Sequence, residues 1–270
     1  MPVAGYGDAC WRWAMEGGND SGAIRIGRTV RRPVRAWTAS VHELLRHLET
    51  KEFEGAPRVL GVDADGREIL TYLEGDTIGG RRVWPEWTRA EDTLRQVARW
   101  LRAYHEAVAD FAPSPDARWR TGGRWAPGLI IAHNDASPFN AAWHDGRLAG
   151  FFDWDFAGPV TRDSDVAWVA LAWVPLHARR VAAAEGFADF AARPARLRLF
   201  LNAYGWAGDP AAVIADIRGR LAERAARIRR LGAAGEPLHA RLLRQGVADD
   251  LDQAVAELEG FPLSGGRQEE

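Results

Sequence analysis

The chain of 270 residues has a single cysteine, a single lysine and no long apolar run. Because Cys10 stands alone, an intramolecular disulfide is impossible, and we expect a reducing compartment. The longest apolar stretch, residues 166–176, is too short to cross a bilayer, so we expect no membrane contact. The first residues also lack the basic and then apolar order of a signal peptide, which predicts a cytoplasmic protein.

The charge balance and the apolar content limit the function further. The formal net charge is −2 and the pI is near 6.4, which argues against nucleic acid as the main partner. Hydrophobic residues make up 47% of the chain, enough to bury a large core in one domain of two lobes or in two small domains. Lys51 is the only lysine, and the other basic residues are arginines.

Residues 131–155 carry many polar side chains. Within this segment, two short apolar runs, residues 140–143 and 148–152, flank Asp145–Gly146, and both of these turn residues tolerate the positive φ of a tight hairpin. A hairpin folded there brings Asn140 and Asp153 to the same open end, with Asp135 in the loop that leads into it. Mg²⁺ prefers oxygen ligands and needs few from the protein, so Asn140 and Asp153 are candidate metal ligands. Asp135 is better placed to accept or orient the proton of a substrate hydroxyl.

The same segment resembles the catalytic motifs of kinases. His133–Asn140 fits the pattern H-x-D-x-x-x-x-N, and Asp153–Asp155 stands where protein kinases have D-F-G. With Trp-Asp in place of Phe-Gly, and with Gly158–Pro159 and Asp165–Ala167 following, the segment is most similar to the aminoglycoside phosphotransferase family. The resemblance extends from about residue 17 to residue 167.

This resemblance implies an α+β, protein-kinase-like fold of two lobes. Residues 1–75 would form a small nucleotide-binding lobe with an antiparallel sheet and one helix. Residues 76–270 would form a larger, mainly helical lobe that carries the catalytic loop and the substrate site. The implied activity is transfer of the γ-phosphate of ATP, with Mg²⁺, to a hydroxyl of a small molecule such as an aminoglycoside-type antibiotic or a metabolite.

The resemblance also assigns nucleotide-binding roles in the first lobe. Side chains alternate along strand 29–33, so only one of Arg31 and Arg32 can face the phosphates, and Arg32 is the favoured one; a solvated basic pair is the alternative. Glu43, on a helix expected at 38–49, would brace that arginine. The further nucleotide contacts that the resemblance implies are a glycine-rich turn at Gly18, for which an ordinary hairpin turn is the alternative, and the hinge backbone at Tyr72 and Leu73.

In the second lobe the family likeness implies supporting roles for two residues. His133 would support the backbone of the catalytic loop, and Asp165 would begin an apolar helix and fix that loop by hydrogen bonds. Asn134 is expected to tolerate a left-handed backbone. His105 lies on the apolar face of a helix and is expected to be a hydrogen-bonded core residue. The Arg- and Trp-rich loop 113–125 could line the substrate or pack on the surface.

Two other function classes remain open. Proteins that resemble this family include immunity factors against peptide toxins, of the trifolitoxin immunity type, so the fold could serve as a binding module without turnover. A metal-dependent hydrolase using His133, Asp135 and Asp153 is the third hypothesis, and it would require imidazole ligands. The identity of the acceptor and the oligomeric state stay open, although a cluster of acids at 249–259 would suit a cationic acceptor.

Overall fold

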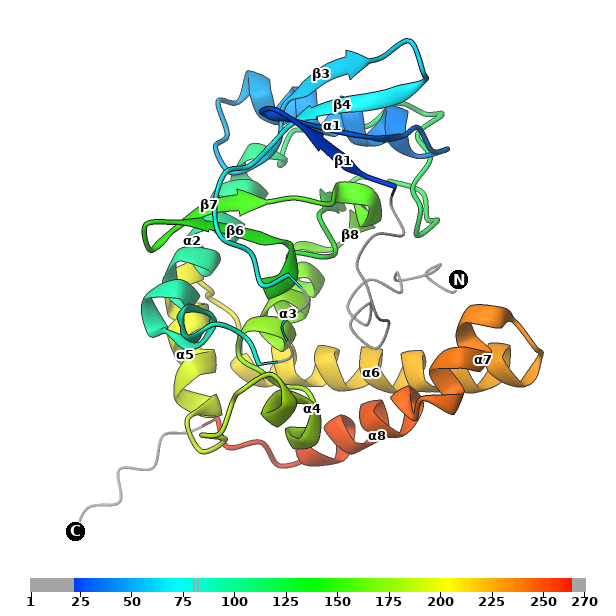
Figure 1. Ribbon diagram of the computed structural model, residues 1–270. Helices are drawn as coiled ribbons and strands as arrows, with labels where there is room; N and C mark the ends of the chain where they lie inside the picture. Colours follow the sequence, from blue (N-terminus) through cyan, green and yellow to red (C-terminus); the bar gives the residue numbers. More distant parts are fainter. Residues whose placement is uncertain (1–21, 80, 82, 264–270) are drawn as a thin grey trace. The chain divides into compact units, whose positions relative to one another are not determined.

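The computed structural model describes residues 22–79, 81 and 83–263, and it is α+β (Figure 1). By its internal contacts the chain divides into two compact units. The first takes in the described residues before 80 together with Arg99–Asp165, and the second takes in Arg81–Ala98 together with the residues from Val166 onward. This division differs from the boundary expected at residue 75, and the lobe boundary stays a prediction.

Strands and 3₁₀ or α-helices alternate through the first two thirds of the chain, and helices alone make up the last third. In chain order the elements are β1 (Ile24–Ile26), β2 (Thr29–Pro33), α1 (Thr38–Thr50), β3 (Val59–Val62), β4 (Arg67–Thr71), η2 (Glu86–Arg89), α2 (Glu91–Ala107), β5 (Ile130–Ala132), η3 (Pro138–Asn140), β6 (Ala141–His144), β7 (Arg147–Phe151), η4 (Trp154–Phe156), β8 (Gly158–Val160), α3 (Arg162–Trp173), α4 (Arg179–Ala184), α5 (Arg193–Tyr204), α6 (Pro210–Ala233), α7 (Pro237–Arg244) and α8 (Val247–Glu257).

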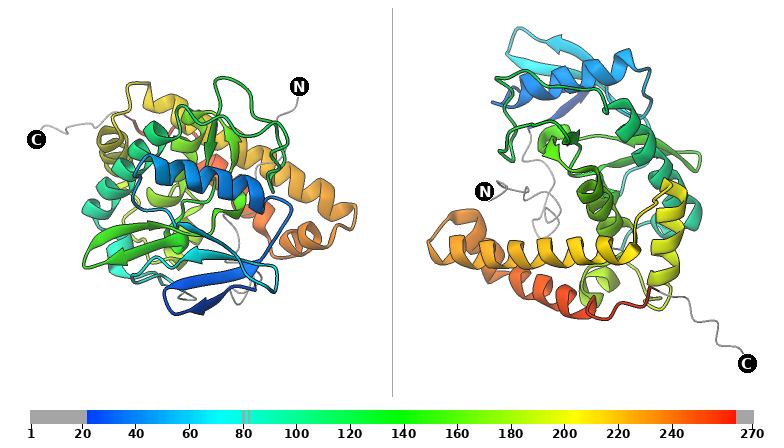
Figure 2. Two further views of the ribbon diagram at one scale, coloured as in Figure 1. Left: turned by 90° about the horizontal axis from the view of Figure 1, so that it is seen from above. Right: turned by 180° about the vertical axis from the view of Figure 1, so that it is seen from behind.

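The first unit begins with a four-stranded antiparallel sheet in the order β1-β2-β4-β3. Helix α1 lies against one face of this sheet (Figures 1 and 2). Its buried apolar side chains are Val41, Leu44, Leu45 and Leu48, spaced three and four residues apart as on one face of a helix. The sheet with one helix confirms the fold expected for the start of the chain.

The hairpin predicted in residues 140–153 is present. Strands β6 and β7 pair antiparallel, and their turn has positive φ at both Asp145 (49°) and Gly146 (74°). A backbone bridge also joins Asp76, in the segment after the sheet, to Trp143 of β6. The segment that leaves the sheet is thereby fixed to the hairpin within the first unit.

The second unit is helical in its described part. Helix α6 begins at Pro210, and the side chain of Asp209 accepts a hydrogen bond from the backbone N–H of Ala211, as the Asp-Pro pair predicts. Helices α7 and α8 then fold back along α6 (Figure 2). In the described part of the chain, no helix is both long enough and apolar enough to cross a membrane.

Candidate active site

Asn140 and Asp153 lie at the open end of the β6–β7 hairpin. Ala141 pairs with Phe151, and the N–H of Phe152 donates a 3.0 Å hydrogen bond to the carbonyl of Asn140, so the two polar residues flank the last pair. Asp153 has a left-handed backbone (φ 61°, ψ 64°), which costs free energy for a residue with a Cβ. The chain turns sharply there into η4.

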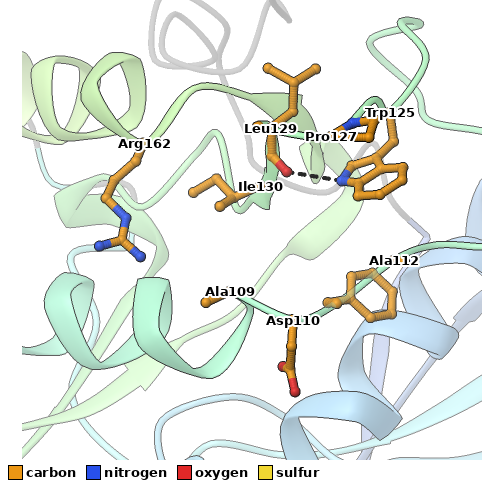
Figure 3. Close-up of a pocket in the computed structure, with 10 residues that line it drawn as sticks. Ala109, Asp110, Ala112, Trp125, Pro127, Leu129, Ile130 and Arg162 are labelled. Atoms are coloured by element: carbon orange, nitrogen blue, oxygen red, sulfur yellow. Dashed lines mark hydrogen bonds between the residues drawn. The ribbon is translucent and has the colours of Figure 1, made fainter.

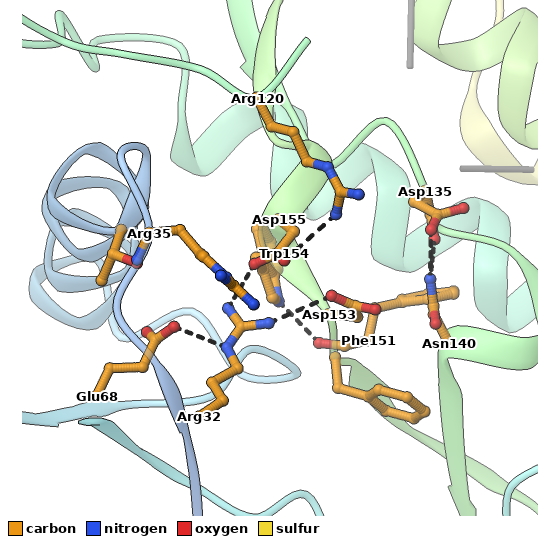
Figure 4. Close-up of polar contacts among 12 residues, drawn as sticks. Arg32, Arg35, Glu68, Arg120, Asp135, Asn140, Phe151, Asp153, Trp154 and Asp155 are labelled. Atoms are coloured by element: carbon orange, nitrogen blue, oxygen red, sulfur yellow. Dashed lines mark hydrogen bonds and ion pairs between the residues drawn. The ribbon is translucent and has the colours of Figure 1, made fainter. Parts of the chain in front are cut away.

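Asp135 is fully buried beside this hairpin end (Figure 4). Its carboxylate accepts hydrogen bonds from Asn140 Nδ2 at 2.8 Å and from Ser137 Oγ at 3.0 Å. The same Asn140 nitrogen donates to the backbone carbonyl of Asp135 at 3.0 Å. Because both of these bonds use the amide nitrogen of Asn140, its amide oxygen is the atom left to act as a ligand.

His133 supports the loop that carries Asp135. Its Nδ1 accepts from the N–H of Asp135 at 3.2 Å, so the proton sits on Nε2, which faces the carbonyl of Phe152 at 3.1 Å. Burial lowers the pKa of His133 to about 4, and the ring is therefore neutral at pH 7. Both ring nitrogens of His133 are hydrogen-bonded to the backbone. His133 therefore has no nitrogen available to bind zinc, as a hydrolase would require.

Asn134 has a left-handed backbone with φ 59°, as predicted. Its side-chain Nδ2 donates to the carbonyls of Phe156 and Gly158, at 3.1 Å and 3.3 Å. These bonds attach the loop 133–140 to the segment that follows Asp153.

Arg32 is the arginine of β2 that faces this site, while Arg31 pairs with Asp63 at 3.2 Å. Its guanidinium contacts three carboxylates, those of Glu68 at 2.7 Å, Asp153 at 3.3 Å and Asp155 at 2.9 Å (Figure 4). Burial alone would lower the pKa of Arg32, but the attraction of the three carboxylates outweighs burial and raises the pKa. Arg32 is therefore a permanent buried cation.

The prediction that Glu43 braces Arg32 is wrong in this structure. Glu43 accepts hydrogen bonds from the backbone N–H of Ser114, at 3.1 Å and 3.3 Å, and its neighbour His42 is the residue of α1 turned toward the sheet. The acid that contacts Arg32 from the sheet is Glu68 of β4, whose second oxygen lies 2.8 Å from His42 Nε2. The physical reason is the rotation of α1, in which adjacent residues point about 100° apart.

Arg120 is a residue of the site that the sequence did not single out. Its Nη1 lies 3.5 Å from Asp155, and its guanidinium covers the ring of Phe156 at 4.3 Å from the centroid. It comes from loop 113–125, for which a substrate-lining role and a packing role were both open. An arginine in an irregular loop gives no periodic signal, so only the abundance of Arg and Trp in that loop pointed to it.

Asp165 does not begin its helix, contrary to the prediction. Helix α3 starts at Arg162, and Thr161 Oγ1 accepts from the N–H of Ser164, so Asp165 stands in the first turn. Its carboxylate lies 2.9 Å from His105 Nε2, and both side chains are buried. His105 is thus a hydrogen-bonded core residue, as expected, and its bond to Asp165 joins α2 to α3 rather than to the catalytic loop.

The remaining predicted nucleotide contacts lie before and after the first sheet. The backbone N–H of Tyr72 donates to the carbonyl of Arg28 at 2.9 Å, and its ring lies under the guanidinium of Arg25. Leu73 follows it, outside any strand, and is half-buried. Gly18 lies outside the described residues. The adenine-binding role of Tyr72 and Leu73 stays a prediction.

The donor set fits a hard divalent cation that also binds phosphate. Four carboxylates lie around the hairpin end, those of Glu68, Asp135, Asp153 and Asp155, together with the guanidinium groups of Arg32 and Arg120, and the side chain of Arg35 also reaches this cluster (Figure 4). Carboxylate and amide oxygens of this kind suit a hard divalent cation that takes few ligands from the protein. Among the described residues, no group of three or more His, Cys, Asp or Glu side chains is arranged to hold a metal ion.

A separate hollow of about 490 Å³ lies in the first unit (Figure 3). Asp110 and Arg162 are its charged lining residues, and Trp125 and Ile130 contribute apolar surface. Asp110 pairs with Lys51 at 2.5 Å, and Arg162 donates to the carbonyl of His105 at 3.1 Å. None of the predicted catalytic residues lines it.

The acidic cluster of the second unit is paired with arginines. Each of its five acids has an arginine partner, the pairs being Asp249 and Asp252 with Arg229, Asp250 with Arg180, Glu257 with Arg179 and Arg193, and Glu259 with Arg218. This neutralisation removes the argument that the cluster serves a cationic acceptor.

Comparisons with known proteins identify the family of the chain. A sequence model described as the phosphotransferase enzyme family matches residues 83–200. A trifolitoxin immunity protein from Rhizobium leguminosarum bv. trifolii is 33% identical over 196 residues, which are 71% of this chain and 73% of the relative.

Two solved structures are similar over most of their length. The amicoumacin kinase hAmiN, in complex with AMP-PNP, Ca²⁺ and Ami, has a TM-score of 0.56 at 11% identity, covering 90% of this chain and 89% of that one. The ADP-bound aminoglycoside phosphotransferase APH(2'')-Ib has a TM-score of 0.55 at 13% identity, covering 87% and 93%. These likenesses confirm the protein-kinase-like fold, with a small antiparallel sheet at the start and a larger helical part.

Proposed function

Because the chain belongs to the phosphotransferase enzyme family, we propose that it transfers the γ-phosphate of ATP to a hydroxyl group of a small molecule. The observation that carries the proposal is the meeting of Asp135, Asn140 and Asp153 at one end of the β6–β7 hairpin, with Arg32 beside them. Phosphoryl transfer asks the protein mainly to position the reactants and to neutralise phosphate charge, and these residues provide both.

Each residue has a role in this proposal. Asp135 orients the acceptor hydroxyl and takes its proton as the new P–O bond forms and the bond to ADP breaks. The carboxylate of Asp153 and the amide oxygen of Asn140 would hold Mg²⁺, and the cation supplies charge neutralisation between the phosphates when bound. Arg32 replaces the strand lysine of related kinases, and its fixed positive charge suits phosphate oxygens.

A thermal-shift titration with ATP tests the nucleotide site. Wild-type protein should show a midpoint that rises with ATP concentration and rises further with Mg²⁺, because a ligand that binds only the folded state stabilises it. Asp153→Ala should lose the extra rise that Mg²⁺ gives. No shift with any purine nucleotide would refute the proposal.

One comparison favours a second candidate, a peptide-toxin immunity protein that acts by binding alone. Its support is the relative of 33% identity that bears the name trifolitoxin immunity protein. The candidates differ in their need for Asp135, since a binding module requires no acceptor for a hydroxyl proton. Protection of cells against a peptide toxin that survives Asp135→Asn would favour binding, whereas protection lost together with phosphate transfer would favour catalysis.

The acceptor itself is proposed only as a small molecule with a hydroxyl group. The acids of α8 are paired with arginines, so nothing in that cluster favours a polycationic aminoglycoside over a neutral or anionic acceptor. Screening of hydroxyl compounds for ADP formation would follow a positive nucleotide titration.

A further inference from the structure

Arg120 approaches Asp155 from the side opposite to Arg32 in its hydrogen bonding, through the second carboxylate oxygen. Its guanidinium is 3.5 Å from one oxygen of Asp155, while the other oxygen of Asp155 is 2.9 Å from Arg32. The two arginines differ in exposure, since the Arg120 side chain is 38% exposed and that of Arg32 only 8%. Arg32 is engaged by three carboxylates, whereas Arg120 has guanidinium surface still open to a ligand.

The loop that delivers Arg120 is attached to one face of the start of α1. The attachment points are Trp37, Ser40 and Glu43, which are three residues apart and so share a helix face. Trp37 lies under the Arg120 guanidinium at 5.2 Å, and Ser40 Oγ accepts from the N–H of Arg118 at 2.8 Å. The Glu43 carboxylate accepts from the N–H of Ser114. Glu43 is therefore a contact of this loop.

The other side of the loop is attached next to the catalytic loop. Gly158 lies so close to the loop that a Cβ placed there would be 2.8 Å from Thr121 Oγ1 and 3.6 Å from the Cβ of Trp119. Asn134, which precedes Asp135, donates to the carbonyl of Gly158. Arg120 stands between Trp119 and Thr121, so its backbone is held beside Gly158 while its side chain reaches Asp155 (Figure 4). Arg32, by contrast, enters from the sheet.

We propose that Arg120 is a second phosphate-binding arginine, which contacts the terminal phosphate of bound ATP and is positioned by Trp37, Ser40 and Glu43 of the α1 face. This inference rests on the proposed function. The proposed contact requires only that guanidinium N–H groups of Arg120 donate hydrogen bonds to the oxygens of the bound phosphate. The terminal phosphate is the part of ATP that lies nearest to the acceptor, which is why Arg120 rather than Arg32 is assigned to it.

Isothermal titration calorimetry with AMP-PNP and with ADP, both in the presence of Mg²⁺, tests this assignment. The two nucleotides differ by the terminal phosphate, so a comparison of their affinities reports on the contacts of that phosphate. Arg120→Ala should bind AMP-PNP about tenfold more weakly than wild type, as expected for the loss of a hydrogen bond to a charged group. Its affinity for ADP should stay within about twofold. Arg124→Ala, which removes another exposed arginine of the same loop, should leave both affinities within about twofold.

The positioning residues provide a second test. Ser40→Ala removes the acceptor for the N–H of Arg118. It should lower the affinity for AMP-PNP less than Arg120→Ala does, and it should leave the affinity for ADP unchanged. Arg120→Lys should restore part of the AMP-PNP affinity that is lost in Arg120→Ala. Equal affinity of wild type and Arg120→Ala for AMP-PNP would overturn the inference and leave the proposed function standing. A wild-type protein that binds neither nucleotide would overturn both, and a parallel loss of both nucleotides in Arg120→Ala would overturn the assignment to the terminal phosphate.

Discussion

Arg32 Nε donates a 2.7 Å hydrogen bond to the carboxylate of Glu68, and the two residues stand opposite each other on strands β2 and β4. The Glu68 side chain is 1% exposed and its other oxygen lies 2.8 Å from His42. A neighbouring strand therefore supplies the carboxylate that orients the arginine. Helix α1 contributes His42 behind that carboxylate.

Glu68→Gln should destabilise the protein. The amide keeps the volume of the side chain but removes the charge that faces Arg32, which leaves a buried cation with two carboxylates instead of three. We expect a loss of about 1–2 kcal/mol in the free energy of unfolding, seen as a thermal midpoint lower by several degrees. Glu49→Gln, at an exposed position of α1, should change the midpoint little. Equal midpoints for wild type and Glu68→Gln would contradict the pairing.

Asp135→Asn should slow transfer strongly without weakening nucleotide binding. The amide cannot accept the hydroxyl proton, so we expect the turnover of ATP, with an acceptor or with water, to fall by about 10²–10⁴-fold. Asp145→Asn is a matched control, because Asp145 is an exposed turn residue and Asn also tolerates its positive φ. A variant at Asp135 with normal turnover would remove this residue from the mechanism.

Stability should fall as the pH is lowered from 7.5 to 5. The pKa of His133 is about 4 in the folded protein and about 6.5 in the unfolded chain, so only the unfolded chain gains a proton between these values. The contribution of His133 is complete above about pH 6.5 and declines toward pH 4, reaching a loss of about 2 kcal/mol at pH 5. Burial lowers the pKa of His177 to about 3, which acts in the same direction.

Urea unfolding at the two pH values checks this dependence. His133→Gln should reduce the difference in unfolding free energy between pH 7.5 and pH 5, because it removes one of the two histidines whose pKa burial lowers. His144→Gln, at an exposed position beside the hairpin turn, should leave the difference unchanged. A protein equally stable at both pH values would contradict the lowered pKa values.

Two glycine-to-alanine substitutions should change the free energy of unfolding in opposite directions. Gly158→Ala places a Cβ 2.8 Å from Thr121 Oγ1 and should destabilise by about 1–3 kcal/mol, because the loop must move. Gly219 lies in α6 with no atom within 4 Å of an added Cβ, so Gly219→Ala should stabilise by about 1 kcal/mol through helix propensity. The thermal midpoints of both variants should be compared with that of the wild type. A higher midpoint for Gly158→Ala would contradict the close approach of Gly158 to loop 113–125.

The parts of the fold that the sequence predicted correctly are those set by local chemistry. Asp145–Gly146 determines a tight turn by its own backbone preferences, and the register of the hairpin then follows, which places Asn140 beside Asp153. Alternation along β2 separates Arg31 from Arg32 in the same way.

The parts that it missed depend on packing between segments distant in the chain. A helix glutamate is the expected bracing acid, which pointed to Glu43, but the rotation of α1 on the sheet turns His42 inward instead. Arg120 reaches Asp155 only because its loop is attached to α1 and to Gly158. The start of α3 was predicted one turn too late, because Thr161, a weaker signal than Asp165, performs the capping.

The proposed role of Arg32, in place of the strand lysine of protein kinases, has a practical chemical consequence. A guanidinium does not lose its proton near neutral pH and so is not a nucleophile, which makes this position inert to amine-reactive nucleotide analogues. Lys51, the only lysine, stands at the end of α1 and pairs with Asp110. Acylating reagents would therefore modify Lys51 and not this position, and dicarbonyl reagents, which are selective for guanidinium groups, would reach Arg120 more readily than the buried Arg32.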